Sequence, residues 1–309
     1  MAITRLRIGT RGSKLALWQS EWVKTKLQNT YPGLEVELVR IKTTGDKILD
    51  SPLSRIGGKG LFVKEIEEAL LLGHVDLAVH SMKDVPVELP EGLMLCCYPE
   101  RDETRDALVS RENLRLQNLP PGAKLGTSSL RRSAQILHIR PDVKIYSLRG
   151  NVDTRLRKLD EGQYDAIVLA AVGLKRLGLS ERVTQHLDPT EVLPAIGQGA
   201  LGLEVREDKH EIIEILSFLN HKPTEFAVRA ERAFLRRLEG GCQVPIAAHA
   251  NFCEEKLKLV GMVADLDGSS LVKGEAQGDA EDAEEIGTGL AEDLLERGAE
   301  KILRRIYEK

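Results

Sequence analysis

The segment GLFVKEIEEALLLGHVDLAVHSM, residues 60–82, contains a helical pattern that is followed almost at once by a strand pattern. Its first part, GLFVKEIEEALLLG, repeats apolar residues with helical spacing and ends at Gly73, a residue type that commonly terminates helices. Its second part, VDLAVHSM, is a short apolar run typical of a buried strand. A helix leading into a buried strand is the repeating unit of α/β sheets with parallel strands.

The same alternation extends from this segment toward both ends of the chain. Upstream, ITRLRIGT, a predicted helix over Lys14–Thr30 and EVELVRIKT form a βαβ unit. Downstream, predicted helices, one running through Ile139 and one over Val152–Leu159, separate the strand patterns DALVS, KLGTSS, VKIYSLRG and YDAIVLAAVG. The first two thirds of the chain are therefore predicted to be α/β.

Two pauses in this alternation suggest how the chain is divided into domains. YPERDETRD follows Cys97, and LPAIGQGA occupies residues 193–200. We expect a first domain of residues 1–99 plus 200–218 and an inserted second domain of residues 105–193. The chain would pass from the first domain to the second and then return to the first. Ligands of such two-lobed folds bind in the cleft at the carboxyl ends of the strands.

The C-terminal third has a different order of elements. The sequence predicts a helix over Thr224–Leu238, strands near Val244–Ala250, Lys256–Val263 and Ser270–Ala276, and a last helix over Ala283–Tyr307. This order indicates a smaller α+β domain over residues 222–309.

Composition limits the classes of protein that the chain can represent. The 309 residues are 42% hydrophobic and 30% charged, with a net charge of −4. No apolar run approaches the roughly 18 residues of a membrane span, and the N-terminus shows no secretory signal pattern. A weakly acidic chain has no global basic field for nucleic acid. We therefore expect a cytoplasmic protein that acts on a small molecule, without a membrane or nucleic-acid partner.

The four cysteines are Cys96, Cys97, Cys242 and Cys253. No pair has the CxxC spacing of a zinc site, so no metal is predicted. Free thiols in a reducing compartment are the simplest interpretation.

Cations occur repeatedly beside the predicted starts of helices, where the helix dipole disfavours them by roughly 0.3–1 kcal/mol each. The cations concerned are Arg11 and Lys14 around Ser13, Lys59 in GGKG, Arg131 and Arg132 after Thr127, Ser128 and Ser129, and Arg149 and Arg155 around GNVD. Each site alone could be a solvated surface arginine after an ordinary N-cap. Four such sites after predicted strands favour a cleft that binds a polyanion.

Phosphate motifs fit these sites poorly. The residue after Lys59 is glycine, which breaks the P-loop pattern, and no G-x-G-x-x-G follows the first strand. Carboxylates are at least as suitable as nucleotide phosphates.

The segment HSMKDVP, residues 80–86, places Ser81, Lys83 and Asp84 at the end of a buried strand. Lys83 and Asp84 could form a plain ion pair. Alternatively, Asp84 stabilises developing positive charge or moves protons, while Lys83 neutralises an acid group of the ligand. His80 is off that face by strand alternation and is interpreted as structural.

Cys242 lies in EGGCQVPIA, just after a predicted helix. A helix C-terminus and the nearby Glu239 both disfavour a thiolate, and no histidine is obviously paired with the cysteine, so a protease-like nucleophile is not expected. A thiol that reacts once with a strong electrophile and then holds the product needs no such activation, so we favour covalent attachment of a group, with an ordinary loop thiol as the alternative.

Taken together, these segments resemble the porphobilinogen deaminase family, also called hydroxymethylbilane synthase. The motifs that carry the resemblance occur in family order along essentially the whole chain: RIGTRGSKLALWQ, GGKGLFVKEIEEAL, HSMKDVP, GTSSLRR, LRGNVDTRL, AVGLKRLG, LPAIGQGALGLE and ERAFLRRLEGGCQVPIA.

The resemblance implies a transferase of tetrapyrrole (heme) biosynthesis. It would condense four porphobilinogen units, with release of ammonia, into the linear tetrapyrrole hydroxymethylbilane. The implied cofactor is a dipyrromethane attached to Cys242 through a thioether. The implied fold has two periplasmic-binding-protein-like α/β domains joined by a double crossover, plus a smaller C-terminal α+β domain, in a monomer.

The resemblance also implies roles for individual residues. Asp84 would be the catalytic carboxylate. Cofactor carboxylates would be bound by Ser13, Ser81, Lys83, Thr127, Ser128, Ser129, Arg131 and Arg132. Substrate would be bound by Arg11, Arg149, Arg155, Arg176 and Gln198, while Lys59 and Phe62 would belong to a lid.

Two other functions remain open at this point. A non-catalytic, two-domain anion-binding protein would share the fold and the cations, but it gives the cysteine signature no role. A Schiff-base enzyme using Lys83 would need an apolar pocket that lowers the lysine pKa, which the surrounding charges do not supply.

Overall fold

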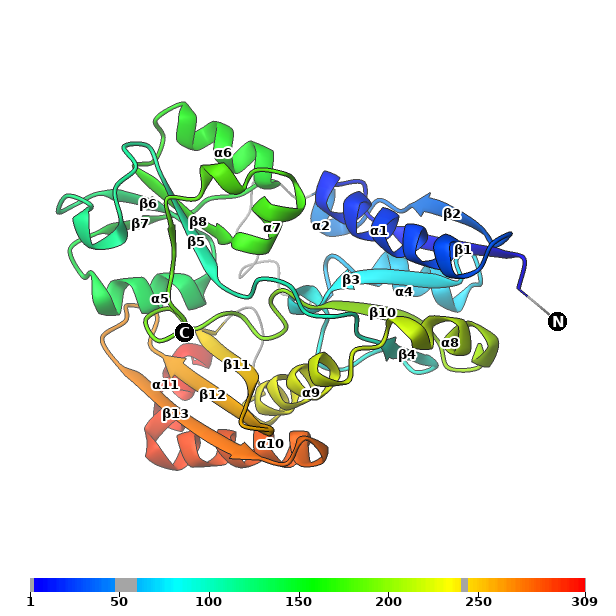
Figure 1. The fold of residues 1–309 in the computed structure, drawn as a ribbon. Coiled ribbons are helices and arrows are strands. Elements are labelled where there is room, and N and C mark those ends of the chain that lie inside the picture. The colour runs from blue at the N-terminus through cyan, green and yellow to red at the C-terminus, as the bar shows by residue number, and fades with distance from the viewer. Residues whose placement is uncertain (1–2, 48–59, 240–243, 309) are drawn as a thin grey trace. The chain divides into compact units, whose positions relative to one another are not determined.

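The computed structural model describes residues 3–47, 60–239 and 244–308. These residues fall into two compact units (Figure 1). The first unit contains residues 3–47, 60–102 and 199–225, and the second contains residues 103–198, 226–239 and 244–308.

The first unit is built on a five-stranded sheet with the order β2-β1-β3-β10-β4. Its strands are β1 (Arg5–Thr10), β2 (Glu35–Arg40), β3 (Leu77–Ser81), β4 (Leu93–Cys97) and β10 (Leu201–Arg206). Its helices are α1 (Lys14–Thr30), α2 (Thr44–Lys47), α4 (Lys64–Leu71) and α8 (His210–Leu216), with short 3₁₀ turns η1 (Met82–Asp84) and η4 (Ser217–Leu219).

Helices cover both faces of this sheet because its inner strands are apolar on both sides. On β3, Leu77 packs in the cluster that contains Val23 of α1, whereas Ala78 packs in the cluster that contains Ile66 and Leu70 of α4. Successive strand residues point to opposite faces, so α1 and α4 lie on opposite sides. This packing fixes where the loops after β1 and β3 emerge.

The second unit contains another five-stranded sheet, with the order β7-β6-β8-β5-β9. Its strands are β5 (Asp106–Ser110), β6 (Lys124–Gly126), β7 (Lys144–Tyr146), β8 (Ala166–Ala170) and β9 (Gln185–His186). The connecting helices are α5 (Leu130–Ile139), α6 (Val152–Asp160) and α7 (Ala171–Arg176), with 3₁₀ turns η2 (Leu116–Asn118) and η3 (Ser180–Arg182). Val168 packs with Ile136 of α5, while Ile167 packs with Leu156 of α6, so this sheet is also covered on both faces.

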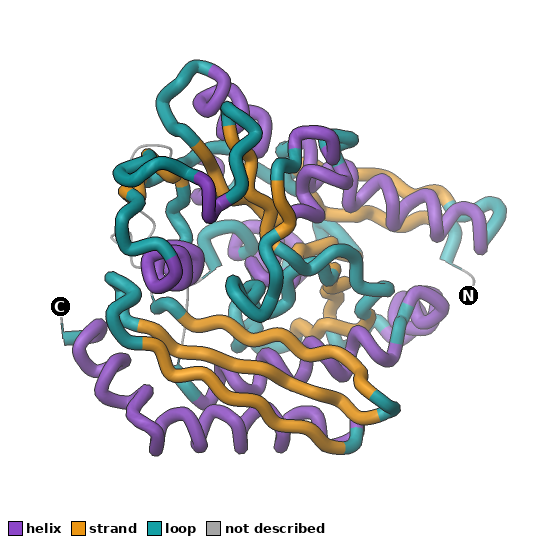
Figure 2. Tube along the Cα trace, turned by 60° about the vertical axis from the view of Figure 1, so that its left-hand side comes forward, coloured by secondary structure: helices purple, strands orange, loops and turns teal. Residues whose placement is uncertain are grey.

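A three-stranded antiparallel sheet completes the second unit (Figure 2). It consists of β11 (Ile246–Cys253), β12 (Lys256–Ala264) and β13 (Leu271–Gly278), with α9 (Lys222–Arg237), α10 (Ala283–Leu294), a π-helical stretch (Leu295–Ala299) and α11 (Glu300–Tyr307). Phe234 of α9 and Leu290 of α10 pack in one core cluster with Leu259 of β12. On the other face, Met262 packs with Ala134 of α5, so α5 contacts both sheets of this unit.

The α/β class with a smaller α+β segment is confirmed, but the large sheets are mixed rather than purely parallel. β10 is antiparallel to β3 and β4, and β5 is antiparallel to β8 and β9. Each of these two strands is the first one after a crossover between units. The handedness rule for βαβ units applies to parallel strands that are joined by a local crossover. A strand that enters from the other unit has no such connection, so it can run antiparallel to its neighbours.

The last helix differs from the expectation of one continuous helix over Ala283–Tyr307. Gly298 has φ of 109° and interrupts the helical backbone between α10 and α11. Only glycine adopts such a conformation readily, which explains the break at this residue.

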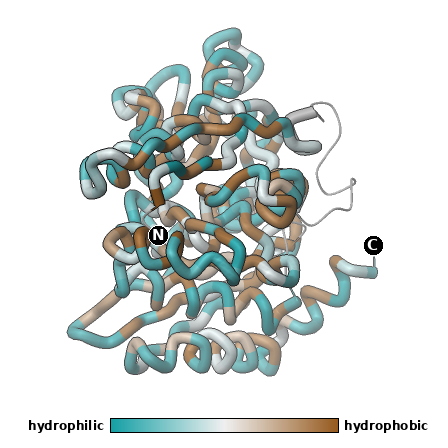
Figure 3. Tube along the Cα trace, turned by 90° about the vertical axis from the view of Figure 1, so that its right-hand side faces the viewer, coloured by the Kyte–Doolittle hydropathy of each residue, from teal (hydrophilic) through white to brown (hydrophobic). Residues whose placement is uncertain are grey.

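Figure 3 shows hydrophilic and hydrophobic residues interleaved along the helices. This pattern is typical of helices with one face packed against the protein and one face exposed to solvent. Within the part of the chain that the structure describes, no helix combines the length and the apolar character needed to cross a membrane.

Candidate functional site

Predicted site residues of the first unit gather where β1 and β3 end. These strands are parallel neighbours, so their carboxyl ends lie at the same edge of the sheet. Arg11 and Ser13 follow β1 directly, while Ser81 ends β3 and Lys83 lies in the turn η1 that follows it. The edge therefore carries two cations and two hydroxyl groups from segments about 70 residues apart in the sequence.

Hydrogen bonds to α1 hold the two hydroxyl groups. The Ser13 hydroxyl caps α1 by accepting from the Ala16 amide at 3.3 Å. Gln19, buried in the next turn of α1, donates from its amide to the Ser81 hydroxyl at 2.9 Å. The hydroxyl groups are thus fixed by the same helix, which is the arrangement expected of a preformed binding edge.

Two further expected site residues, Phe62 and Asp84, lie in this unit. The Arg11 guanidinium carbon lies 4.3 Å from the centroid of the Phe62 ring, a cation–π contact. Asp84 ends η1, and its side chain is exposed. The Met82 amide, which donates to the Ala200 carbonyl at 3.0 Å, anchors the turn to the start of β10.

Behind this edge lies a buried acidic cluster that sequence reasoning did not identify. His80 Nε2 is 2.8 Å from Glu204 Oε2, and both side chains are almost fully buried. Glu67 of α4 is only 6% exposed, and burial, reinforced by the Glu204 carboxylate and opposed by His80, raises the pKa of Glu67 to about 7. The structural interpretation of His80 agrees with this position, although no pattern in the sequence pairs it with a residue 124 positions away.

The pKa of Glu67 predicts a specific dependence of stability on pH. Because its pKa is about 7 when folded and near 4.5 when exposed, the protonated carboxyl favours the folded state. That contribution is complete below about pH 4.5 and is lost as the pH rises through about 7. We expect Glu67→Gln to become more stable relative to the parent protein as the pH rises from 5 to 8, by at most about 3 kcal/mol.

Urea unfolding of both proteins at the two pH values checks this expectation. Glu88→Gln is the control, because Glu88 is an exposed carboxylate of the same unit. A stability difference between Glu67→Gln and the parent protein that does not change with pH would contradict it.

In the second unit, the predicted residues again follow the ends of parallel strands. Thr127, Ser128 and Ser129 come after β6, which pairs in parallel with both β7 and β8. Ser129 caps α5 by accepting from the Arg132 amide at 3.4 Å. Ser128 contacts the Ser147 hydroxyl at 2.9 Å and so links the loops after β6 and β7.

The remaining arginines of this unit occupy three different positions. Arg149 precedes α6 and is half-buried, as is Arg155, whose Nε donates to the Gly150 carbonyl at 2.8 Å. Arg176 ends α7 and is 8% exposed. Arg149 therefore lies in the loop after β7, Arg155 lies in the first turn of α6, and Arg176 follows β8 at the end of α7.

Arg131 and Arg132 have a partner that sequence reasoning missed. Asp106, fully buried at the start of β5, lies 2.7 Å from Arg132 Nη2 and 2.8 Å from Arg131 Nη1. Burial alone would raise the pKa of Asp106, but the two guanidinium groups outweigh it and hold that pKa well below its usual range. The only available signal was an aspartate that opens the apolar strand DALVS.

Gln198 is also buried, and the structure shows which groups it contacts. Its side-chain amide donates to Asp106 Oδ1 at 2.9 Å and to the Thr104 carbonyl at 2.7 Å. A contact between Gln198 and substrate stays a prediction. Two other expected residues, Lys59 and Cys242, lie outside the described residues.

The residues at these edges fit a ligand rich in carboxylates. At the start of α5, two buried guanidinium groups face one buried carboxylate, which leaves one positive charge in excess. The hydroxyl groups of Thr127 and Ser129 and the dipole of α5 add further anion-binding capacity. This donor set suits the acetate and propionate groups of a dipyrromethane.

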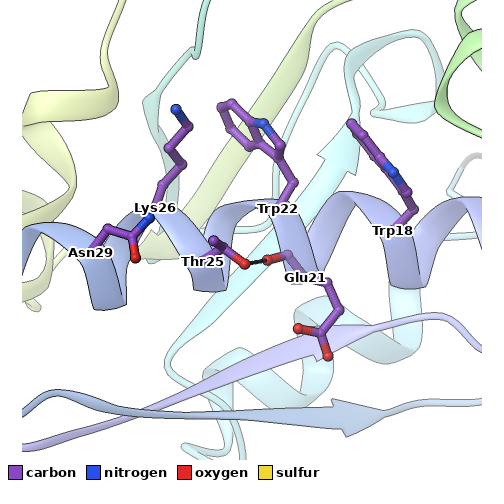
Figure 4. A pocket seen from close by; sticks show the side chains of 6 residues that line it. All are labelled: Trp18, Glu21, Trp22, Thr25, Lys26 and Asn29. Carbon is purple, nitrogen blue, oxygen red and sulfur yellow. Dashed lines mark hydrogen bonds between the residues drawn. The ribbon is translucent and has the colours of Figure 1, made fainter.

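A separate hollow lies on the outer face of α1 (Figure 4). It is lined by Trp18, Glu21, Trp22, Thr25, Lys26 and Asn29. The Lys26 ammonium lies 5.5 Å from the centroid of the Trp22 ring. None of the expected site residues lines this hollow.

Comparison with solved structures finds distant resemblances. The periplasmic aliphatic sulphonate binding protein SsuA from Escherichia coli superposes with a TM-score of 0.42 and 17% identity, over 77% of this chain and 71% of that one. An ancestral cationic amino acid solute binding protein, AncCDT-1, gives a TM-score of 0.44 and 16% identity, over 70% and 88% of the two chains.

Comparison of sequences gives much closer matches. A family model described as "Porphobilinogen deaminase, dipyromethane cofactor binding domain" matches residues 6–214, and one described as "Porphobilinogen deaminase, C-terminal domain" matches residues 225–296. The porphobilinogen deaminase of Geobacter sulfurreducens is 58% identical over 100% of this chain and 97% of its own length. That of Pelobacter propionicus is 57% identical over 99% and 98% of the two chains. The chain therefore belongs to the porphobilinogen deaminase family.

Proposed function

We propose that this protein is a transferase that condenses porphobilinogen units, with release of ammonia, into the linear tetrapyrrole hydroxymethylbilane. The observation that carries the proposal is the agreement between full-length family membership and sheet edges lined with groups that bind carboxylates. Each porphobilinogen carries an acetate and a propionate, so substrate and product are polyanions. Bidentate guanidinium groups and helix N-termini are well suited to such ligands.

In the first unit, Asp84 is the proposed catalytic carboxylate. It is exposed at the end of η1, so a ligand can reach it without displacing a buried neighbour. Its negative charge stabilises the positive charge that develops on a pyrrole as ammonia leaves. Ser13, Ser81 and Lys83 bind cofactor carboxylates, and Arg11 binds substrate.

In the second unit, the start of α5 is the proposed anchor for cofactor carboxylates. The residues that act there are Thr127, Ser128, Ser129, Arg131 and Arg132. Substrate carboxylates are bound by Arg149, Arg155 and Arg176, with a contribution from Gln198. Lys59 and Phe62 belong to the proposed lid.

Cys242 is the proposed attachment point of the dipyrromethane. When bound, this group supplies the pyrrole carbon to which the next pyrrole unit is joined. A thioether holds it without the low thiol pKa that repeated nucleophilic catalysis requires. The cysteine acts as a tether, while the charged side chains orient the carboxylates.

The proposal includes the organisation of the chain and its setting in the cell. The domains are residues 1–99 plus 200–218, residues 105–193 and residues 222–309. The protein acts in the cytoplasm as a monomer. Its role is one step of heme biosynthesis.

Intact mass spectrometry tests the proposal most directly. The denatured protein, purified from cells that make porphobilinogen, should exceed the mass calculated from the sequence by two pyrrole units. Incubation with porphobilinogen should then release one ammonia for each unit consumed and give a linear tetrapyrrole. A protein that neither carries nor takes up pyrroles would refute the proposal and favour a non-catalytic anion-binding protein.

A further inference from the structure

Asp106 holds two guanidinium groups with a single buried carboxylate. Its Oδ1 accepts from Arg132 Nε at 3.0 Å and from Arg132 Nη2 at 2.7 Å, while its Oδ2 lies 2.8 Å from Arg131 Nη1. The side chain of Asp106 is fully buried, and those of the two arginines are at most 8% exposed. These contacts join the first residue of β5 to the first turn of α5.

A second set of hydrogen bonds joins the two guanidinium groups to backbone carbonyls. Arg131 Nη1 donates to the Leu193 carbonyl at 2.7 Å, and Arg132 Nη1 donates to the Val168 carbonyl at 3.2 Å. Each guanidinium is therefore held by the carboxylate and by one backbone carbonyl. Because a guanidinium is planar, two such contacts determine the direction of its remaining N–H groups.

The Asp106 carboxylate is itself held in place. Gln198 donates to Oδ1 at 2.9 Å and to the Thr104 carbonyl at 2.7 Å. The preceding residue, Gly197, donates its amide to Glu231 Oε2 at 2.6 Å. Glu231 also accepts from the Ala250 amide of β11 at 2.8 Å, so the position of Gln198 depends on α9 and on the three-stranded sheet.

The net charge of Asp106, Arg131 and Arg132 argues against a purely structural role for this ion pairing. One arginine would neutralise Asp106, yet two are buried against it, so one positive charge is in excess. Burying an uncompensated charge is costly, and the adjacent start of α5 adds positive potential rather than negative. An anionic ligand group removes this cost, whereas further packing does not.

We propose that Asp106 is a positioning residue, which holds Arg131 and Arg132 in the orientation that receives a carboxylate of the dipyrromethane and leaves one positive charge for it. This inference rests on the proposed function, in which both arginines bind the cofactor. Asp106 does not contact the ligand. It acts through the direction and the net charge of the two guanidinium groups.

The test uses the full-length apoprotein, produced in cells that make no porphobilinogen. Parent protein and Asp106→Asn are incubated with porphobilinogen, and intact mass records how fast pyrroles become attached. Asparagine has nearly the same shape but no charge, so the guanidinium groups lose their common anchor. We expect attachment to slow by about tenfold to a hundredfold, the range for loss of a charged hydrogen bond.

A second readout separates positioning from a merely structural role. The melting temperature is measured for each protein before and after pyrrole attachment. If Asp106 positions the arginines, the increase in melting temperature on attachment should shrink in Asp106→Asn. If Asp106 only stabilises the fold, the forms of Asp106→Asn with and without attached pyrroles should each melt lower than the corresponding parent form, and by the same amount. Attachment should then proceed at the parent rate. That result would overturn the inference.

Two further variants complete the design. Asp142→Asn removes the carboxylate that binds Arg140 just beyond the other end of α5, and it should load at the parent rate. Asp106→Glu keeps the charge but moves the carboxylate by one methylene, so it should fold even where Asp106→Asn does not and should still load slowly. Parent-like loading of Asp106→Glu together with unfolded Asp106→Asn would count against positioning. Failure of the parent protein to load would instead refute the proposed function.

Discussion

Replacing Asp84 by alanine is expected to lower turnover by about two to three orders of magnitude, the usual effect of removing one group that stabilises a transition-state charge. The turn that carries Asp84 is held by backbone hydrogen bonds, from the Met82 amide to Ala200 and from the Val85 amide to Met82. These contacts do not involve the carboxylate, so the turn should persist in the variant.

Stability measurements separate this loss from damage to the fold. Asp84 is exposed, and among the residues that the structure describes its carboxylate forms no hydrogen bond or ion pair. The unfolding free energy of Asp84→Ala should therefore lie within about 0.5 kcal/mol of the parent value. Asp84→Asn should lose nearly as much turnover, because the amide keeps the shape and removes the charge.

Glu88→Ala provides the matched control. Glu88 is exposed in the same loop, four residues after Asp84, and its loss changes the net charge equally. Steady-state rates of porphobilinogen consumption should be near the parent value for Glu88→Ala. Turnover of Asp84→Ala within about tenfold of the parent would remove Asp84 from the catalytic role.

Replacing Cys242 by serine is expected to abolish covalent attachment of pyrroles and, with it, all turnover above background. A serine hydroxyl is a far weaker nucleophile than a thiol near neutral pH, and an oxygen cannot form the thioether. The variant should purify at the mass calculated from its sequence. It should also melt at the temperature of the parent apoprotein, because a bound group stabilises only the form that binds it.

Cys253→Ser is the control for this substitution. Cys253 is an exposed free thiol at the end of β11, in the same part of the chain as Cys242. It should load pyrroles and turn over like the parent protein. A pyrrole adduct on a peptide of Cys242→Ser, or full turnover by that variant, would contradict the proposal that Cys242 is the attachment point of the cofactor.

Local patterns predicted the secondary structure well where the pattern itself is local. The helix over Lys14–Thr30 was predicted with the bounds that the structure shows, because an N-cap serine and periodic apolar residues define it. The directions of β5 and β10 could not be predicted in this way. They depend on pairing with strands distant in the sequence, and alternation alone assigns no direction.

The same distinction applies to the candidate site. The cations near helix starts were visible in the sequence because they lie beside their own caps. Asp106 was not, because it is 26 residues from Arg132 and 92 from Gln198, and only folding brings the three together. Glu204 was missed for the same reason, since a glutamate inside LGLEVRE has no local signal of burial.

The position of β10 between β3 and β4 has a consequence for synthesis on the ribosome. When β4 leaves the exit tunnel, β10, its partner among the strands that the structure describes, follows about 100 residues later in the chain and has not yet emerged. At roughly 5–20 residues per second, β3 and β4 wait about 5–20 seconds with unpaired backbone edges. The sheet of β5–β9 comes from one continuous segment and can form during that delay. The N-terminal strands are therefore translated first, but their sheet is completed second, and nascent chains in that interval are a natural target for chaperones.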